Sequence, residues 1–221
     1  MKKFILILMT VFFSGIGAMA QMTTGHVAYK IDVTSDDPEA AMTIAMFANS
    51  SMDLFFDGDV SRVDLDMGGL MSIGTVSDAV SGEVLILLGG LMGNMGVITS
   101  LEEMGTDEDD SDENVTVTLS KETKTIAGYK CKKAVLLDEE GNEITYWYTD
   151  KIKANTKGQD NFNNKIPGFP LEYSVNNEGM LMTFTATVVE KKLDNKSALF
   201  AIEIPAGYQE MTYEEFSSMG M

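Results

Sequence analysis

The chain has 221 residues, of which 34 are Asp or Glu and 16 are Lys or Arg, so its formal net charge at pH 7 is −18. A charge of this sign and size repels phosphate backbones and anionic lipid surfaces, which argues against nucleic acid as a partner. A single cysteine excludes an intramolecular disulfide, so the folded state depends on side-chain burial. The length suffices for one domain with a sizeable core, and we predict one domain over residues 21–221.

Residues 1–20 have the layout of a secretory signal peptide. Lys2 and Lys3 precede an apolar run from Phe4 to Phe13, and Ala18-Met19-Ala20 fits a cleavage site. A membrane anchor is the alternative, but it needs roughly 20 apolar residues, and this run is interrupted at Ser14-Gly15. No cysteine follows the cleavage site to carry a lipid. We therefore predict a protein that is exported, either periplasmic or extracellular, and not lipid-anchored.

The N-terminal part of the mature chain predicts a strand followed by a helix. Residues alternate between apolar and polar over Gly25–Val33, which indicates a half-buried strand. Asp37 is suited to cap a helix, and Pro38 to occupy its first position. The helix is expected to continue to about Ala48. Because it is apolar on nearly all sides, we expect most of its surface to be buried.

Strand signals return after this helix. Met52, Leu54 and Phe56 alternate before a turn at Asp57-Gly58, and Asp-Gly between alternating segments is typical of a hairpin. The next strand is expected over 63–67, and two further strands over 70–76 and 84–88. Together these segments predict an antiparallel meander.

Residues 84–101 include no charged side chain and just reach the length of a membrane span. Four glycines and an asparagine interrupt the middle of this segment. We therefore favour a buried strand, then a pliable Gly- and Met-rich loop or short helix, and a return through Val97–Leu101.

An acidic segment, TDEDDSDE over 106–113, is predicted to be a solvated loop. Asp107, Asp109 and Asp112 offer oxygen atoms to a cation such as Ca²⁺. The segment lacks the glycine that an EF-hand loop needs at its sixth position, and Thr118 stands where the bidentate Glu belongs. We predict no specific metal site here.

The segment 123–149 predicts a long β-hairpin, which contains the only Trp and the only Cys of the chain. If Gly141-Asn142 forms a two-residue turn, Val135 and Leu137 share a face with Tyr146 and Tyr148. A loop with an odd number of residues would reverse this pairing.

The rest of the chain predicts three more strands and a helix. The strands are expected over Leu171–Val175, Met180–Glu190 and Leu199–Ile204. Thr212 and Glu215 have the spacing of a capping box, which indicates a short C-terminal helix.

Three motifs carry a resemblance to a known family: TIAGYKCKKA over 125–134, YWYT over 146–149 and IPGFPLE over 166–172. Together they resemble the uncharacterised exported domains of Bacteroidetes-type bacteria, including the GLPGLI family. Pro167-Gly168 matches the centre of the GLPGLI motif, whereas Lys165, Ile166, Phe169 and Pro170 depart from it. Such domains are similar to the half-barrels of lipoprotein-carrier (LolA-type) proteins, whose concave face takes up acyl chains. The resemblance implies no established activity.

Catalytic chemistry finds little support in the sequence. His26 is the only histidine and is expected to be a solvated strand residue, and no serine lies in a Gly-x-Ser-x-Gly motif. Lys130 and Lys132 flank Cys131 and would lower its pKa, but its position in a strand favours a small packed thiol. The 17 methionines offer sulfur ligands to Cu(I), yet no His or Cys lies near Met92 or Met95, and methionine is more often an apolar filler. We predict no enzyme, metal or cofactor.

These observations favour a mainly β (α+β) fold, a curved antiparallel sheet or half-barrel with one or two covering helices. We predict a non-catalytic binding protein whose partner is a lipid or another apolar molecule, held in a pliable pocket between sheet and helix. The predicted ligand-binding residues are Met42, Met46, Leu87, Leu91, Met92, Met95 and Trp147. For each residue the alternative is a place in the packed core. The alternative function is a cell-envelope interaction or structural module that contacts a protein partner.

Overall fold

The computed structural model describes residues 21–91, 93–105, 115–137, 143–157, 165–177 and 179–219. The predicted signal peptide, the predicted acidic loop 106–113 and Met92 lie outside the described residues.

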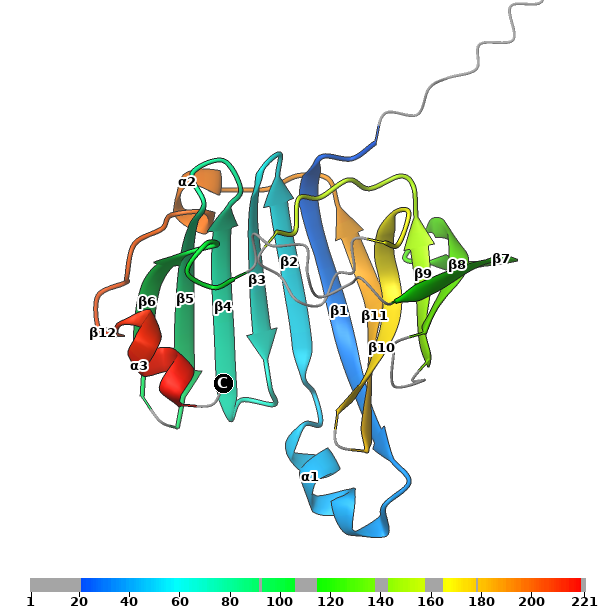
Figure 1. The fold of residues 1–221 in the computed structure, drawn as a ribbon, viewed down its shortest axis with the longest axis horizontal. Coiled ribbons are helices and arrows are strands. Elements are labelled where there is room, and N and C mark those ends of the chain that lie inside the picture. The colour runs from blue at the N-terminus through cyan, green and yellow to red at the C-terminus, as the bar shows by residue number, and fades with distance from the viewer. Residues whose placement is uncertain are drawn as a thin grey trace, which may run out of the picture.

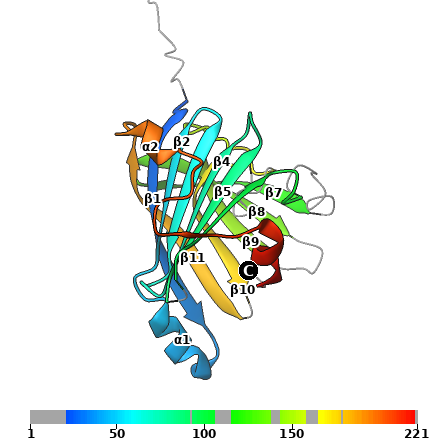
Figure 2. The same cartoon turned by 90° about the vertical axis from the view of Figure 1, so that its left-hand side faces the viewer.

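Within these ranges, twelve strands form one curved sheet that does not close into a barrel (Figures 1 and 2). Neighbouring strands are antiparallel, except that the two-residue β12 runs parallel to β6. The strands are β1 (Thr24–Ser35), β2 (Ser51–Asp57), β3 (Val60–Asp66), β4 (Met71–Asp78), β5 (Glu83–Gly90), β6 (Met95–Ser100), β7 (Thr116–Ile126), β8 (Tyr129–Leu137), β9 (Glu143–Thr149), β10 (Phe169–Asn177), β11 (Met180–Glu190) and β12 (Gln209–Glu210). The predicted fold class is confirmed.

The strand order, β12-β6-β5-β4-β3-β2-β1-β11-β10-β9-β8-β7, joins two antiparallel meanders. β1 pairs with β2 on one side and with β11 on the other, and the β1–β11 ladder extends from the pair His26–Glu190 to the pair Ser35–Met180. β1 therefore connects the two halves of the sheet.

The two faces of the sheet follow from the alternation along each strand. Val27, Leu54 and Val63 are paired across β1, β2 and β3, and all three are buried on the concave face. The next row, His26, Phe55 and Arg62, lies on the convex face. Figure 2 shows α3 (Tyr213–Ser218) on the concave side and α2 (Lys196–Leu199) on the opposite side.

The helix after β1 begins as expected but packs differently. Asp37 caps the 3-10 helix η1 (Pro38–Ala40) by accepting a hydrogen bond from the backbone N–H of Glu39. α1 (Ala41–Met46) ends before Ala48 and contains no buried residue, so the prediction that most of its surface is buried is wrong. Because β1 and β2 pair along their length, the connection between them turns at the end of the sheet, and α1 projects beyond the strands (Figure 1).

The central hairpin has the opposite pairing to the one a two-residue turn would give. Leu137 pairs with Glu143, which leaves residues 138–142 as an odd-numbered loop. Ala134 therefore lies opposite Tyr146, and Leu136 opposite Ile144, on the concave face. Val135 pairs with Thr145 on the other face, which is the arrangement expected for an odd number of intervening residues; Gly141 and Asn142 lie outside the described residues.

The predicted strand Leu199–Ile204 is not formed. After α2, the side chains of Phe200, Ile202 and Ile204 pack against Val76, Leu85 and Leu87 on the convex face. Apolar and other residues alternate in this segment as predicted. The apolar side chains cover the convex face of the sheet, and the backbone does not pair with a strand. The predicted capping box of α3 is confirmed, since Thr212 and Glu215 satisfy each other's backbone N–H groups.

The charge-free segment 84–101 contains β5, the turn and β6, as expected for the strand–loop–strand reading. β5 is buried on both faces, because α3 covers one side and the segment after α2 the other. No helix among the described residues has the length and apolar character to cross a membrane.

Candidate functional site: the concave cleft

The centre of the concave face is a packed aromatic core. Tyr173 stacks on Phe184 with ring centroids 4.7 Å apart and on Tyr146 at 5.9 Å, and the ring of Tyr29 meets Tyr173 edge-on. The hydroxyl of Tyr29 donates a 2.8 Å hydrogen bond to the carbonyl oxygen of Pro170. Burial raises the pKa of both Tyr29 and Tyr173, so both phenols stay neutral and serve packing.

Toward the end of the sheet that carries α1, here called the α1 end, the concave face becomes less covered. Six apolar side chains there are only partly buried, whereas Leu88, which pairs with both Ile73 and Met95, is buried. They come from strands of both halves of the sheet. The set, here called the cleft residues, is Val33, Leu65, Ile73, Met95, Val175 and Met182.

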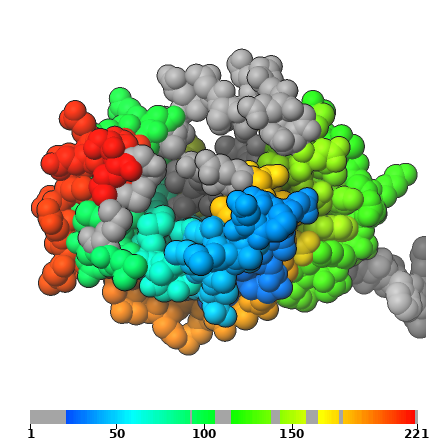
Figure 3. Space-filling view, turned by 90° about the horizontal axis from the view of Figure 1, so that it is seen from below, coloured from blue at the N-terminus to red at the C-terminus, as the bar shows by residue number. Residues whose placement is uncertain are grey.

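One helix lies beside the cleft residues. Tyr213 and Phe216 of α3 pack with Ile73 against Val84, Ile86 and Val97. Ile152 and Ile166, from the segment between β9 and β10, belong to the main core and lie toward the opposite end of the sheet, where Ile152 pairs with Met22. Figure 3, seen from the α1 end, shows the red α3 and the green strands of the other half on opposite sides of the molecule.

The predicted ligand-binding residues are not brought together. Met42 and Met46 are on the exposed α1, and Leu91, at the turn after β5, is 84% exposed. Leu87 and Trp147 lie on the convex face, whereas Met95 is one of the cleft residues. Met92 is outside the described residues.

Sequence reasoning missed Leu65, Ile73 and Met182 as cleft residues. The signal that finds them is the strand register, because Leu65 pairs with Ile73 in one half and Val33 pairs with Met182 in the other. The sequence shows the alternation of each strand, but not which strands share a row.

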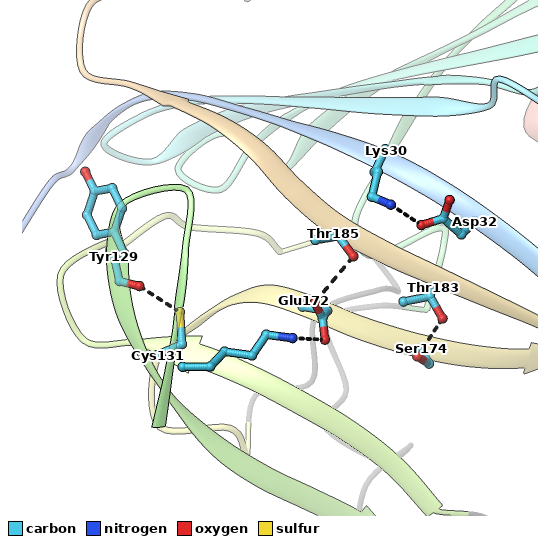
Figure 4. Close-up of polar contacts among 9 residues, drawn as sticks. Lys30, Asp32, Tyr129, Cys131, Glu172, Ser174, Thr183 and Thr185 are labelled. Carbon is cyan, nitrogen blue, oxygen red and sulfur yellow. Dashed lines mark hydrogen bonds and ion pairs between the residues drawn. The ribbon is translucent and has the colours of Figure 1, made fainter. Parts of the chain in front are cut away.

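Trp147 is part of a polar cluster on the convex face. The ammonium of Lys124 lies 5.0 Å from the centre of the Trp147 ring and 2.5 Å from Oε1 of Glu172. Oε2 of Glu172 also accepts from the hydroxyl of Thr185 at 3.5 Å (Figure 4). The indole face is therefore occupied by a cation and is not a pocket wall.

A polar depression of about 250 Å³ lies on the same convex face. Arg62 donates from Nε to both carboxylate oxygens of Asp64, at 2.9 and 2.8 Å, and from Nη1 to the carbonyl of Leu199 at 3.2 Å. The depression is also lined by Asp53, whose Oδ1 lies 2.6 Å from Nε2 of His26. The hydrogen bond from Arg62 to Leu199 links β3 to α2. The carboxylates of Asp64 and Asp53 pair with Arg62 and His26.

His26 is not the solvated residue that the sequence predicts. Its ring stacks on Phe55 with centroids 4.4 Å apart, and its two nitrogens lie 2.6 Å from Asp53 and 3.6 Å from Glu190. Because both nitrogens face carboxylates, the ring has no nucleophile to activate.

Cys131 is a packed thiol, as the strand pattern indicates. Its side chain is buried, and its Sγ donates weakly to the carbonyl oxygen of Tyr129 at 3.6 Å (Figure 4). Burial raises its pKa to about 11, so the nucleophilic thiolate is scarce at neutral pH. Over the ranges that the structure describes, no group of three or more His, Cys, Asp or Glu side chains is arranged to hold a metal ion.

The fold of this chain is similar to that of a protein of known structure. An uncharacterized conserved protein from Thermus thermophilus has a TM-score of 0.52 and 13% identity, with 86% of this chain and 91% of that chain covered. PNGF-II, in its P21 crystal form, has a TM-score of 0.49 and 17% identity. The match covers 89% of this chain but 33% of PNGF-II, so this chain spans about a third of that protein's length.

A LolA superfamily protein from Nitrosomonas europaea aligns over 80% of this chain and 90% of its own, at 11% identity and a TM-score of 0.26.

No curated protein matches the sequence. One family model does match, over residues 93–215, which is more than half of the chain and extends from the turn before β6 into α3. That model describes the N-terminal domain of the N-glycanase peptide, and the GLPGLI name receives no support from it. The chain therefore belongs to the family of the N-glycanase peptide, N-terminal domain.

Proposed function

We propose that this protein binds a lipid or a similarly apolar ligand in the concave cleft and catalyses no reaction. The observation that carries the proposal is the set of cleft residues, which are apolar but only partly buried on the concave face. Apolar side chains that line a concave surface are the usual lining of a small-molecule site.

The chemistry of the cleft suits a flexible ligand. Met95 and Met182 have unbranched, polarizable side chains that adjust to irregular apolar shapes, and they lie in different halves of the sheet. Leu65 and Ile73, paired on β3 and β4, share a row with Met95 in one half. Met182 lies beyond that row in the other half, opposite Val33. An acyl chain that contacts both Met95 and Met182 would reach both halves.

The proposal that the protein is not an enzyme is supported by its two strongest catalytic candidates. His26 faces two carboxylates, and the thiol of Cys131 is buried and protonated. The family name refers to an N-glycanase, but the matching model describes an N-terminal domain. We infer a binding role for this chain, in the exported location that residues 1–20 predict.

Two neighbouring residues of β11 provide a matched test. Met182 lies on the concave face, opposite Val33, whereas Leu181 lies on the convex face and is 42% exposed. We expect Met182→Gln to weaken uptake of a fluorescent fatty acid roughly tenfold, in line with the loss of one apolar contact of about 1–2 kcal/mol. Leu181→Gln should leave uptake unchanged.

Native mass spectrometry of the protein purified from its own cells, followed by organic extraction, identifies a ligand directly. A stoichiometric lipid supports the proposal. A protein that carries nothing and takes up no fatty acid, or equal uptake by Met182→Gln and the parent protein, contradicts it. Trp147→Phe should have no effect on uptake, because Trp147 is on the convex face.

A second function, that of an interaction module without a small-molecule ligand, is favoured by exposed apolar side chains outside the cleft. Met42 is 78% exposed and Leu91 is 84% exposed. Exposed apolar side chains that cluster often mark an interaction site. An empty cleft together with a purified protein partner would select this second function.

A further inference from the structure

Three connections at the α1 end are built from uncharged residues. The segments 40–52, 67–77 and 84–101 contain no charged side chain, although the chain has a net charge of −18. Exposed carboxylates flank them, because Asp36, Asp37 and Glu39 precede α1 and Asp66 ends β3.

These three segments meet in space. A Cβ atom on Gly68, in the β3–β4 turn, would collide with the carbonyl oxygen of Met46 and lie 3.1 Å from that of Ala48, so α1 rests on this turn. The backbone N–H of Leu91 donates to the carbonyl oxygen of Leu70 at 3.3 Å, so the β5–β6 turn rests on the same turn. The three connections form one ridge, here called the apolar end, made of α1, residues 67–70 and Leu91.

The apolar end exposes large apolar side chains. Met42 is 78% exposed, Met46 50% and Leu91 84%. Met42 and Met46 are on α1, which projects beyond the strands (Figure 1), and Leu91 is in the turn after β5. Exposing them to water is unfavourable, and a covering surface would remove that cost.

We propose that the apolar end docks on the surface of an electrically neutral lipid layer. The exposed side chains lie on separate connections, and methionine side chains are flexible, so a fluid lipid surface can adapt to each of them. A folded protein partner would need a surface of complementary shape. Charge selects the type of lipid. Asp36, Asp37 and Glu39 lie just before α1 and are exposed, so they would repel an anionic surface but not a zwitterionic one.

This inference goes beyond the proposed ligand binding and rests on residues outside the cleft. The cleft residues lie at the same end of the sheet, so docking would bring them toward the lipid layer. Docking is nevertheless measurable on a protein whose cleft is empty, so either proposal can fail alone.

The test is flotation of the full mature chain with phosphatidylcholine vesicles, compared with vesicles that also contain an anionic phospholipid. We expect binding to the neutral vesicles and weaker binding to the anionic ones. The variant Met42→Ser/Met46→Ser/Leu91→Ser should bind neutral vesicles at least about tenfold less, because three side chains no longer enter the apolar layer. All three positions are exposed, and circular dichroism checks that the fold is kept.

Val80 provides the matched control. It is 79% exposed, equally apolar, and lies on the β4–β5 turn at the opposite end, so Val80→Ser should leave vesicle binding unchanged. Absence of binding to neutral vesicles, or undiminished binding of the triple variant, overturns the proposal. So does a dimer in sedimentation equilibrium that the triple variant abolishes without any vesicle binding, since the apolar end would then meet a second copy. Met182→Gln, which changes the cleft alone, should float like the parent protein.

Discussion

The hydroxyl of Tyr29 on β1 donates a 2.8 Å hydrogen bond to the carbonyl oxygen of Pro170 on β10, although β11 separates these strands in the sheet. Tyr29 and Pro170 are both buried. The bond is possible because the sheet curves enough for side chains on its concave face to reach beyond the adjacent strand. It also satisfies a carbonyl next to the register shift between β9 and β10.

Removing this hydroxyl should therefore destabilise the fold. We expect Tyr29→Phe to lower the free energy of unfolding by about 1–3 kcal/mol, because the buried carbonyl of Pro170 loses its donor. Urea unfolding followed by Trp147 fluorescence measures the change. Tyr129→Phe is the control: its hydroxyl meets only the weak acceptor Sδ of Met22, at 3.9 Å, so a smaller loss is expected. Equal losses of unfolding free energy in the two variants would contradict a stabilising role of the hydrogen bond from Tyr29 to Pro170.

The packing of the segment after α2 depends on a missing side chain at Gly96. A Cβ at this position would lie 2.8 Å from Cγ2 of Ile204. We expect Gly96→Ala to cost about 1–3 kcal/mol of unfolding free energy from overpacking. In an Ile204→Ala background the same substitution should cost clearly less, which a double-mutant cycle by urea unfolding measures. Identical costs in both backgrounds would place the strain elsewhere.

The thiol of Cys131 should be chemically silent in the folded protein. Its pKa is raised to about 11 by burial, so we expect negligible alkylation by iodoacetamide at pH 8 and rapid alkylation in urea, measured by intact mass. The raised pKa means that the folded state holds this proton more tightly than the unfolded state. The stability that the Cys131 thiol contributes through its raised pKa is therefore present below pH 9 and is lost as the pH rises toward 11. Alkylation of the native protein at the rate of the unfolded chain would contradict the buried position.

Asp57 ties the start of α2 to the end of β2. Lys196 lies 2.8 Å from its Oδ2, and this hydrogen bond, with a second one from Thr24, lowers the pKa of the carboxyl. A lowered folded-state pKa gives stability that is present above the ordinary value of 3.8 and is lost as the pH falls through the folded-state value.

Asp57→Asn should accordingly cost about 0.5–1 kcal/mol at pH 7, the range of a surface ion pair, and close to nothing at pH 2. Urea unfolding at both pH values measures this. Asp194→Asn is the control. The side chain of Asp194 is 90% exposed and that of its partner Lys192 is 87% exposed, so this ion pair should contribute little to the free energy of unfolding. A cost for Asp57→Asn that does not depend on pH would contradict the charge-based explanation.

The sequence by itself determined the strands and the helix starts. Alternation predicts β1, β2 and β11, Asp37 caps the first helix, and Thr212 with Glu215 begins the last one. These features depend on residues a few positions apart, whose interactions do not require knowledge of the rest of the fold.

Only the tertiary structure decided what each apolar residue faces. Leu87 and Trp147 have the composition of a pocket lining, but the register places them on the convex face, because one step along a strand reverses the side. The position of α1 beyond the strands follows from the pairing of β1 with β2, and the odd loop 138–142 sets the faces of β8 and β9. The cleft joins residues of strands far apart in the chain, so no local pattern predicts it.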